Sequence, residues 1–222
     1  IPAVGRAQEL MMVIDKYMKS GEMTESSVFM EGMIQEATAI HEAHPEYLER
    51  TLKQKILETD DNPFDSEFFT NIEHADGRDE PLREDSPCII IATSGMLEGG
   101  PVLEYFRNLA PVQKNKILFV SYQVNGTLGR RVMDGARQVS ILGREGKIEV
   151  VSINCATERL EGFSGHSDYN QLMSYVHRLR PKLRRVLVNH GEKRKLENLS
   201  ASIRRMYRVT AHYPQVQEAI KL

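Results

Sequence analysis

The chain has 222 residues, which is long enough for one large domain or two small ones with a buried core. No apolar run approaches the about 18–20 residues that span a membrane, and the first residues carry no signal peptide, so we expect a cytoplasmic protein without a membrane partner. The net charge of −2 conceals an asymmetry, because residues 22–85 hold 18 Asp/Glu against 5 Lys/Arg, whereas residues 151–222 hold 13 Lys/Arg against 6 Asp/Glu. The basic C-terminal third is either a solvated face or a surface that meets a polyanion.

The first part of the chain predicts helices around one short strand. Residues Arg6–Lys19 have the helical period, and the face expected to be buried consists of Leu10, Val13, Ile14 and Tyr17. Three further elements are a short strand at Ser27–Met30, a helix that follows Gly32 and ends at Glu42, and a helix from Pro45 to about Leu57. Residues 59–86 are acidic and rich in turn residues, so they predict an irregular insertion with room for one short strand or helix.

From residue 88 onward the pattern alternates strands with helices. The apolar run Cys88–Ala92 predicts a buried strand of the parallel-sheet kind, and Pro101 begins a helix to Leu109. The later strands are expected at Lys116–Ser121, 137–142, 147–153, Arg184–Asn189 and Arg208–Ala211, and the later helices within Gly126–Met133, Asp168–Leu179 and Glu192–Tyr207. This alternation predicts an α/β fold with a mainly parallel sheet flanked by helices.

Three turns that follow a strand and precede a helix could carry chemistry, because ligands gather beyond the carboxyl ends of strands in open α/β sheets. The first turn runs from Ser94 through Gly95 and Met96 to Gly100. Its small residues would let backbone N–H groups approach a phosphate at a helix N-terminus. The same composition also suits a plain tight turn.

Two histidines occupy the other turns. His166, flanked by glycine and serine just before a helix, could act as an acid toward a leaving oxygen or as a metal ligand, or could simply be satisfied at the helix start. His190 follows an apolar strand and precedes Gly191, a placement that aims an imidazole at a metal but also suits a turn residue bonded to backbone. His41 and His44 form a weaker candidate pair, because a proline follows and no third ligand is near.

Together these turns resemble one family. Five motifs stand in its order: Gly5–Glu9, Ala92–Met96, Gly126–Arg130, Phe163–His166 and His190–Glu192. They are typical of the metallo-β-lactamase-type RNA nucleases called β-CASP nucleases. The chain looks most similar to archaeal homologues of the cleavage and polyadenylation specificity factor (CPSF) nuclease, and the resemblance covers nearly all of it.

The resemblance implies a zinc-dependent ribonuclease of RNA 3′-end processing, transcription termination or decay, acting as an endonuclease or a 5′-exonuclease. In that family a metallo-β-lactamase domain and an inserted β-CASP domain enclose a two-zinc site that hydrolyses RNA phosphodiesters. His166 matches a catalytic histidine expected near the scissile phosphate, and His190 matches a zinc ligand. The positions that match the family's RNA-facing residues are Ser94, Gly95, Met96, Ser164, Gly165 and, with packing as an alternative, Arg130. Asn189 departs from the family, in which many members have an apolar residue there.

In that family most zinc ligands come from a His-x-His-x-Asp-His motif, another histidine and an acidic residue upstream. The chain contains no His-x-His, so these ligands have no match in it. A two-metal site needs ions about 3.5–4 Å apart with several ligands each, so we expect two zinc ions only in a complete protein and no activity from this chain alone. Residues 1–145 are expected to form the β-CASP domain and residues 146–222 a C-terminal segment of a metallo-β-lactamase fold. The implied partners are RNA, the missing metallo-β-lactamase portion, and a second copy that pairs through Val209–Leu222.

Two other functions remain open from the sequence. A non-catalytic RNA-binding or dimerisation module is the main alternative, and a His-x-His-x-Asp-His motif encoded upstream of Ile1 would distinguish the nuclease from it. A small-molecule α/β enzyme is disfavoured, because Ser94–Gly100 contains neither Gly-x-Gly-x-x-Gly nor Gly-Lys-Ser/Thr.

Overall fold

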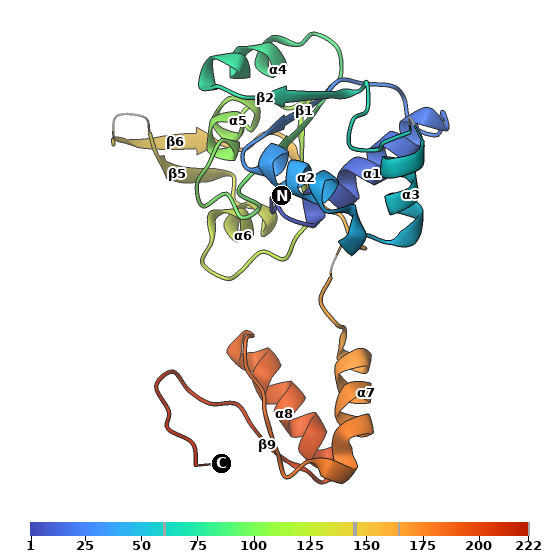
Figure 1. The fold of residues 1–222 in the computed structure, drawn as a ribbon. Helices are drawn as coiled ribbons and strands as arrows, with labels where there is room; N and C mark the ends of the chain where they lie inside the picture. The colour runs from blue at the N-terminus through green and yellow to red at the C-terminus, as the bar shows by residue number, and fades with distance from the viewer. Residues whose placement is uncertain (60, 144–145, 164, 222) are drawn as a thin grey trace. The chain divides into compact units, whose positions relative to one another are not determined.

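The computed structural model describes residues 1–59, 61–143, 146–163 and 165–221. The chain divides into two compact units, Ile1–Ser164 and Gly165–Leu222, called here the first and second unit (Figure 1). The predicted α/β fold is confirmed, since the strands form small, mostly parallel sheets flanked by helices. In these ranges no helix combines the length and the apolar character needed to cross a membrane.

The first unit begins with a three-stranded parallel sheet in the order β2-β1-β3. Its strands are β1 (Val28–Glu31), β2 (Phe69–Ile72) and β3 (Ile89–Ala92). Around it lie the helices α1 (Arg6–Lys19), α2 (Ile34–Ala43), α3 (Arg50–Glu58) and α4 (Asp79–Arg83), with the 3₁₀ turns η1 (Pro45–Tyr47) and η2 (Ala75–Arg78). Strand β1 is buried along its whole length, as a central strand of a parallel sheet should be.

Helix α1 has the predicted bounds, but it buries a different face. The buried residues that pack in the core of the sheet are Ala7, Met11, Ile14 and Met18. Of the predicted face only Ile14 is buried; Leu10 is partly buried, and Val13 and Tyr17 are 38% and 41% exposed. The prediction was wrong because it passed over methionine, whose unbranched side chain fills irregular core space well.

Two stretches before residue 86 are more finely divided than predicted. The single helix expected from Pro45 to Leu57 is η1 followed by α3. Helix α3 starts anew because the Glu49 carboxylate caps it, accepting from the backbone N–H of Thr51 at 2.8 Å and of Leu52 at 3.3 Å. The insertion expected to be irregular contains β2, η2 and α4.

The rest of the first unit adds two pairs of strands around a second core. Strand β4 (Lys116–Phe119) pairs in parallel with β7 (Ala156–Arg159), and β5 (Gln138–Leu142) pairs antiparallel with β6 (Ile148–Ser152). Helices α5 (Val102–Leu109) and α6 (Leu128–Met133) complete it. Strand β7 was not predicted, because its sequence Ala-Thr-Glu-Arg has no apolar run.

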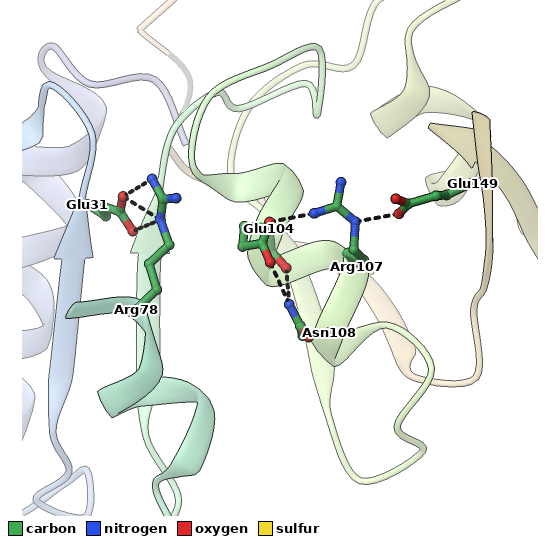
Figure 2. Close-up of polar contacts among 6 residues, drawn as sticks. All are labelled: Glu31, Arg78, Glu104, Arg107, Asn108 and Glu149. Atoms are coloured by element: carbon green, nitrogen blue, oxygen red, sulfur yellow. Dashed lines mark hydrogen bonds and ion pairs between the residues drawn. The ribbon is translucent and has the colours of Figure 1, made fainter. Parts of the chain in front are cut away.

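A buried carboxylate joins β1 to two other elements, and Figure 2 shows its contact with the first of them, through Arg78. Glu31, only 7% exposed, receives three hydrogen bonds from Arg78, with Nε–oxygen distances of 2.8 and 3.0 Å and an Nη2–Oε1 distance of 2.6 Å. Tyr105 of α5 donates its hydroxyl to the same carboxylate at 2.7 Å. The hydrogen bond to Glu31 raises the pKa of Arg78, and burial raises the pKa of Tyr105, so both groups remain protonated donors.

Helix α5 is also joined to the β5–β6 pair (Figure 2). The Arg107 Nε lies 2.7 Å from a carboxylate oxygen of Glu149 on β6, and the same guanidinium pairs with Glu104 on its own helix. Asn108 donates to Glu104 at 3.1 Å. Tyr105 and Arg107 therefore anchor α5 at the first sheet and at the β5–β6 pair respectively.

The second unit is a small α/β unit. It contains α7 (Tyr169–Leu179), η3 (Arg180–Lys182), β8 (Arg185–Leu187), α8 (Lys193–Tyr207) and β9 (Thr210–His212), with β8 and β9 parallel. Asp168 caps α7 as predicted: its carboxylate accepts from the Gln171 N–H at 2.8 Å, and the Gln171 side chain accepts from the Asp168 N–H at 2.8 Å. Its buried apolar core consists of Met173, Val176, Val188, Ile203, Val209 and Ala211.

The boundary between the two units lies at Ser164/Gly165, whereas the predicted domain boundary lies at residue 145. Strands β6 and β7 pair with β5 and β4, so these strands pack with the first unit. A compact unit of this chain and a domain of a longer protein need not share their limits, and the boundary at residue 145 stays a prediction.

Candidate functional site

The carboxyl ends of β1 and β3 lie side by side, with Glu31 opposite Ala92 in the register. In the order β2-β1-β3 the chain passes from β1 to β2 on one side and then crosses to β3 on the other side of β1. Sheets of this kind hold ligands beyond the carboxyl ends of the strands at which the order reverses, which here are β1 and β3. Gly32 follows β1 with a φ of +98°, and a Cβ on it would lie 2.0 Å from the Thr93 Oγ1. Only glycine permits this close approach of the two strand ends.

The loop from Ser94 to Gly100 begins at this edge of the sheet, two residues after the end of β3. The Ser94 N–H donates to the Gly99 carbonyl at 3.1 Å, and the Ser94 Oγ accepts from the Glu98 N–H at 3.2 Å. The loop is therefore a closed turn that leads into α5, and Ser94, Gly95 and Met96 are half-buried. The structure places these three residues where the sequence put them, and their contact with RNA stays a prediction.

The same loop touches the start of α6, so two of the predicted segments meet. The Met96 carbonyl accepts from the Gly129 N–H at 2.8 Å, and the Glu98 carboxylate accepts from the Leu128 N–H at 2.6 Å. Arg130 follows directly, and its Nε pairs with Asp134 at 2.8 Å one turn along the helix. This ion pair holds Arg130 along α6, and its role toward RNA stays a prediction.

Gln123 is a residue of this site that the sequence did not reveal. It lies between β4 and α6, is completely buried, and donates its side-chain amide to the Gly95 carbonyl at 2.8 Å. The sequence held one signal for it: Gln123 comes just after an apolar strand. A polar side chain that is buried at such a place needs an internal hydrogen-bond partner.

In the second unit, His166 and His190 stand in equivalent places. His166 is two residues before Asp168, which caps α7, and His190 is two residues before Glu192, the N-cap position of α8. The turn η3 connects α7 to β8. Both histidines are exposed. Gly165 beside His166 is also exposed, whereas Ser164 lies outside the described residues.

The backbone at His190 explains the unusual Asn189. His190 has a φ of +60°, and its N–H donates to the Asn189 Oδ1 at 2.7 Å. Histidine tolerates this left-handed conformation better than most residues do. Gly191 follows closely packed, since a Cβ there would lie 3.0 Å from the Leu196 Cδ2. The strand therefore ends in a fixed turn that carries an exposed imidazole, and the asparagine supports that turn.

Three other histidines have local partners. The His41 Nδ1 lies 2.6 Å from the Ala37 carbonyl, and His44 lies 3.3 Å from Glu46. The His212 Nε2 lies 2.8 Å from Glu218, whose pKa is lowered first by the backbone N–H of Gln215 and then by this imidazole. These contacts account for all three imidazoles without a metal.

The second unit is the basic part of the chain. Every Lys and Arg in it is exposed: Arg178, Arg180, Lys182, Arg184, Arg185, Lys193, Arg194, Lys195, Arg204, Arg205, Arg208 and Lys221. Only four acidic residues accompany them, namely Asp168, Glu192, Glu197 and Glu218. Exposed guanidinium and ammonium groups in this excess attract phosphate backbones.

Comparison with known proteins identifies the family. Residues 7–132 match the family model of the Beta-Casp domain. The chain belongs to the β-CASP family. Residues 150–214 of this β-CASP chain also match the family model of the Zn-dependent metallo-hydrolase RNA specificity domain. The resemblance carried by the five sequence motifs is confirmed.

Curated relatives match the β-CASP chain along its whole length. Over 222 residues it is 78% identical to a protein of Cenarchaeum symbiosum, over 220 residues 46% identical to one of Thermococcus kodakarensis, and over 219 residues 44% identical to one of Methanocaldococcus jannaschii. Each of these archaeal proteins is named transcription termination factor FttA. The matches cover 99–100% of this chain and 34% of each relative, so the chain spans about a third of their length.

The zinc that this family implies does not find a complete site in the β-CASP chain. Among residues 1–59, 61–143, 146–163 and 165–221, no three His, Cys, Asp or Glu side chains gather in a group that could hold a metal ion. His190 offers one exposed imidazole, which is one ligand of the several that such an ion needs. The described residues alone do not fit a zinc ion, and no reaction step through zinc is assigned to them.

Proposed function

We propose that this chain is the RNA-facing part of a zinc-dependent ribonuclease that acts in transcription termination, RNA 3′-end processing or RNA decay. The observation that carries the proposal is the presence of both family models, the Beta-Casp domain and the RNA specificity domain, in one chain. The name of the relatives, transcription termination factor, favours termination among the three processes.

In this proposal the two histidines of the second unit have different roles. His166 acts beside the scissile phosphate, and His190 supplies one zinc ligand. Each is exposed and stands two residues before the N-cap position of a helix of the second unit, which supports a role for both. The residues proposed to face RNA are Ser94, Gly95, Met96, Arg130, Ser164 and Gly165.

The other zinc ligands are proposed to come from a metallo-hydrolase portion of a longer cytoplasmic protein. One observation supports docking by the second unit: α7 carries exposed apolar side chains at helical spacing, Tyr169, Leu172, Tyr175 and Leu179, with exposures of 46%, 38%, 65% and 37%. An exposed apolar stripe of this kind marks an interaction surface. Pairing of two copies through Val209–Leu222 is proposed in addition.

A cleavage assay tests the incompleteness of the chain. The 222-residue chain with added zinc is expected to leave a labelled single-stranded RNA intact, because one imidazole cannot assemble a two-metal site. The protein as its gene encodes it is expected to cleave the same RNA and to lose that activity in EDTA. Robust cleavage by the chain alone, abolished by EDTA, would sink the claim that the chain lacks most of its metal site.

The alternative function is a non-catalytic RNA-binding or dimerisation module. The exposed basic side chains of the second unit favour it, because they require no metal to attract RNA. Absence of zinc-dependent cleavage by the whole encoded protein, together with retained RNA binding, would select this alternative.

Replacement of Arg184, Arg185 and Arg194 by alanine is expected to weaken RNA binding by the chain and to make it less sensitive to salt. All three are exposed in the second unit, and for single-stranded RNA each lost phosphate contact reduces the slope of log K against log salt by about 0.7, or roughly 2 for all three. The dissociation constant should be measured from low to moderate salt.

A triple replacement in the first unit serves as the control. Lys16, Arg50 and Lys53 are exposed cations of that unit, and replacing all three should leave the slope unchanged. A dissociation constant of the unaltered chain that is independent of salt would contradict the proposal.

A further inference from the structure

Gln123 lies in a loop, yet its side chain is buried and hydrogen-bonded to two backbone carbonyls. Its side chain is 0% exposed, and its Nε2 donates to the Gly95 carbonyl at 2.8 Å and to the Ser121 carbonyl at 3.1 Å. These bonds satisfy the Nε2, whereas the Oε1 is buried without a hydrogen-bond partner among the described residues. Burying the amide is unfavourable unless it is bonded, so the two accepting carbonyls position this side chain. The bond to Gly95 joins positions 28 residues apart.

The other side of the amide packs against α6. A Cβ on Gly129 would lie 2.0 Å from the Gln123 Oε1 and 2.9 Å from the Met96 carbonyl oxygen. The absence of a side chain at Gly129 lets its N–H reach the Met96 carbonyl at 2.8 Å. Gln123 is therefore confined between the Ser94–Gly100 loop and the first turn of α6.

A further hydrogen bond, exposed to solvent, joins the Ser94–Gly100 loop to the first turn of α6. Glu98 accepts the Leu128 N–H at 2.6 Å, which satisfies one of the free backbone donors at the start of α6. Three points of the loop, at Gly95, Met96 and Glu98, are thus tied to the segment from Gln123 to Gly129. The carbonyls of Gly95 and Met96 both accept inward-directed bonds, which fixes the peptide planes of the loop.

We propose that Gln123 is a positioning residue that holds the Ser94–Met96 loop in the conformation that receives an RNA phosphate. The inference rests on the proposed function, in which this loop faces RNA. Gln123 acts through the backbone of Gly95 and does not itself touch RNA, because it is completely buried. A loop fixed before binding loses less conformational freedom when the ligand arrives, so its affinity is higher.

Gln123→Met tests the proposal, because methionine keeps the length of the side chain and removes the donor to Gly95. In the protein as its gene encodes it, this change is expected to raise the dissociation constant for RNA, and the KM for cleavage, about tenfold. The kcat should change much less, because the residue does not act on the reacting atoms. Gln123→Asn, a milder change, serves if the methionine variant does not fold.

Gln8→Met is the matched control. Gln8 is likewise buried, at 2% exposure, and its amide donates to the Thr38 Oγ1 at 2.8 Å, within the core of the first sheet. Both variants should lower the unfolding midpoint, but Gln8→Met should leave RNA affinity unchanged. Equal losses of affinity in the two variants would show a merely structural role and overturn the proposal.

Ser94→Ala separates this inference from the function on which it rests. If Ser94→Ala leaves RNA affinity unchanged, the RNA-facing role of the loop fails. If Ser94→Ala weakens binding while Gln123→Met and Gln123→Asn do not, the loop faces RNA and the positioning role fails. The proposal expects both single variants to weaken binding and the double variant to weaken it by less than the product of the two effects.

Discussion

Replacing His190 by alanine in the protein as its gene encodes it is expected to lower RNA cleavage by at least about a hundredfold, and to lower the bound zinc. The imidazole stands at the end of β8 on a turn fixed by the Asn189 side chain, and it is exposed. The substitution removes one proposed bond to zinc, whereas the hydrogen bond that supports the turn joins the backbone N–H of residue 190 to Asn189 and does not use the imidazole. Cleavage rate and zinc content should be measured on the same sample.

Two other histidines sharpen this experiment. His166→Ala should reduce kcat by about 10²–10⁴-fold while zinc content stays unchanged, as expected for a group that transfers a proton. His177→Ala removes an exposed imidazole near the far end of α7 and should alter neither quantity. Unchanged zinc content and activity in His190→Ala would remove the ligand role proposed for this residue.

Replacing Arg78 by methionine is expected to lower the free energy of unfolding of the first unit by about 3–5 kcal/mol. The change leaves the Glu31 carboxylate, 7% exposed, with the Tyr105 hydroxyl as its remaining side-chain donor in the described structure. A buried charge that has lost its partner costs far more than the intact pair contributes. Such a loss is a large part of the about 5–15 kcal/mol that stabilise a typical domain, and urea unfolding measures it.

Arg83 provides the matched control for this experiment. It makes a similar pair with Asp79 at 2.6 Å, but the two side chains are 79% and 64% exposed. Arg83→Met should therefore cost less than about 1 kcal/mol. A double replacement of Arg78 and Glu31 by methionine should recover much of the lost stability, because neither charge is then left buried. Equal effects of Arg78→Met and Arg83→Met would show that burial of Glu31 is not the cause.

The order of most helices and strands could be predicted from the sequence, whereas some breaks between them and one short strand could not. Helix α1 was predicted at its observed bounds, because its apolar residues recur with the helical period. The break between η1 and α3 depends on the Glu49 side chain bonding two backbone donors, an arrangement that an apolar pattern does not report. Strand β7 was missed because it is short, polar and paired with β4 only through tertiary structure.

The candidate site shows the same limit. Ser94 and His190 were predicted as site residues because small residues and strand ends give local signals, and Arg130 because it stands in a motif that resembles the family's; their roles stay predictions. The meeting of the Ser94–Gly100 loop with the start of α6 is a long-range contact, and no local pattern predicts it. Gln123 escaped for this reason, since its partner Gly95 is 28 residues away. The zinc ligands missing from the described residues remain outside what this chain can specify.

The small core of the second unit has a consequence for how the chain unfolds. Six buried apolar residues hold its two three-residue strands and two helices together. A unit of this size buries a small fraction of its surface, so its separate stability is low compared with that of the first unit, which has two cores. Heating or denaturant should therefore melt the chain in two steps, with the second unit lost first. The loss of a binding surface and the loss of the fold are then separate events, and a single midpoint does not describe this protein.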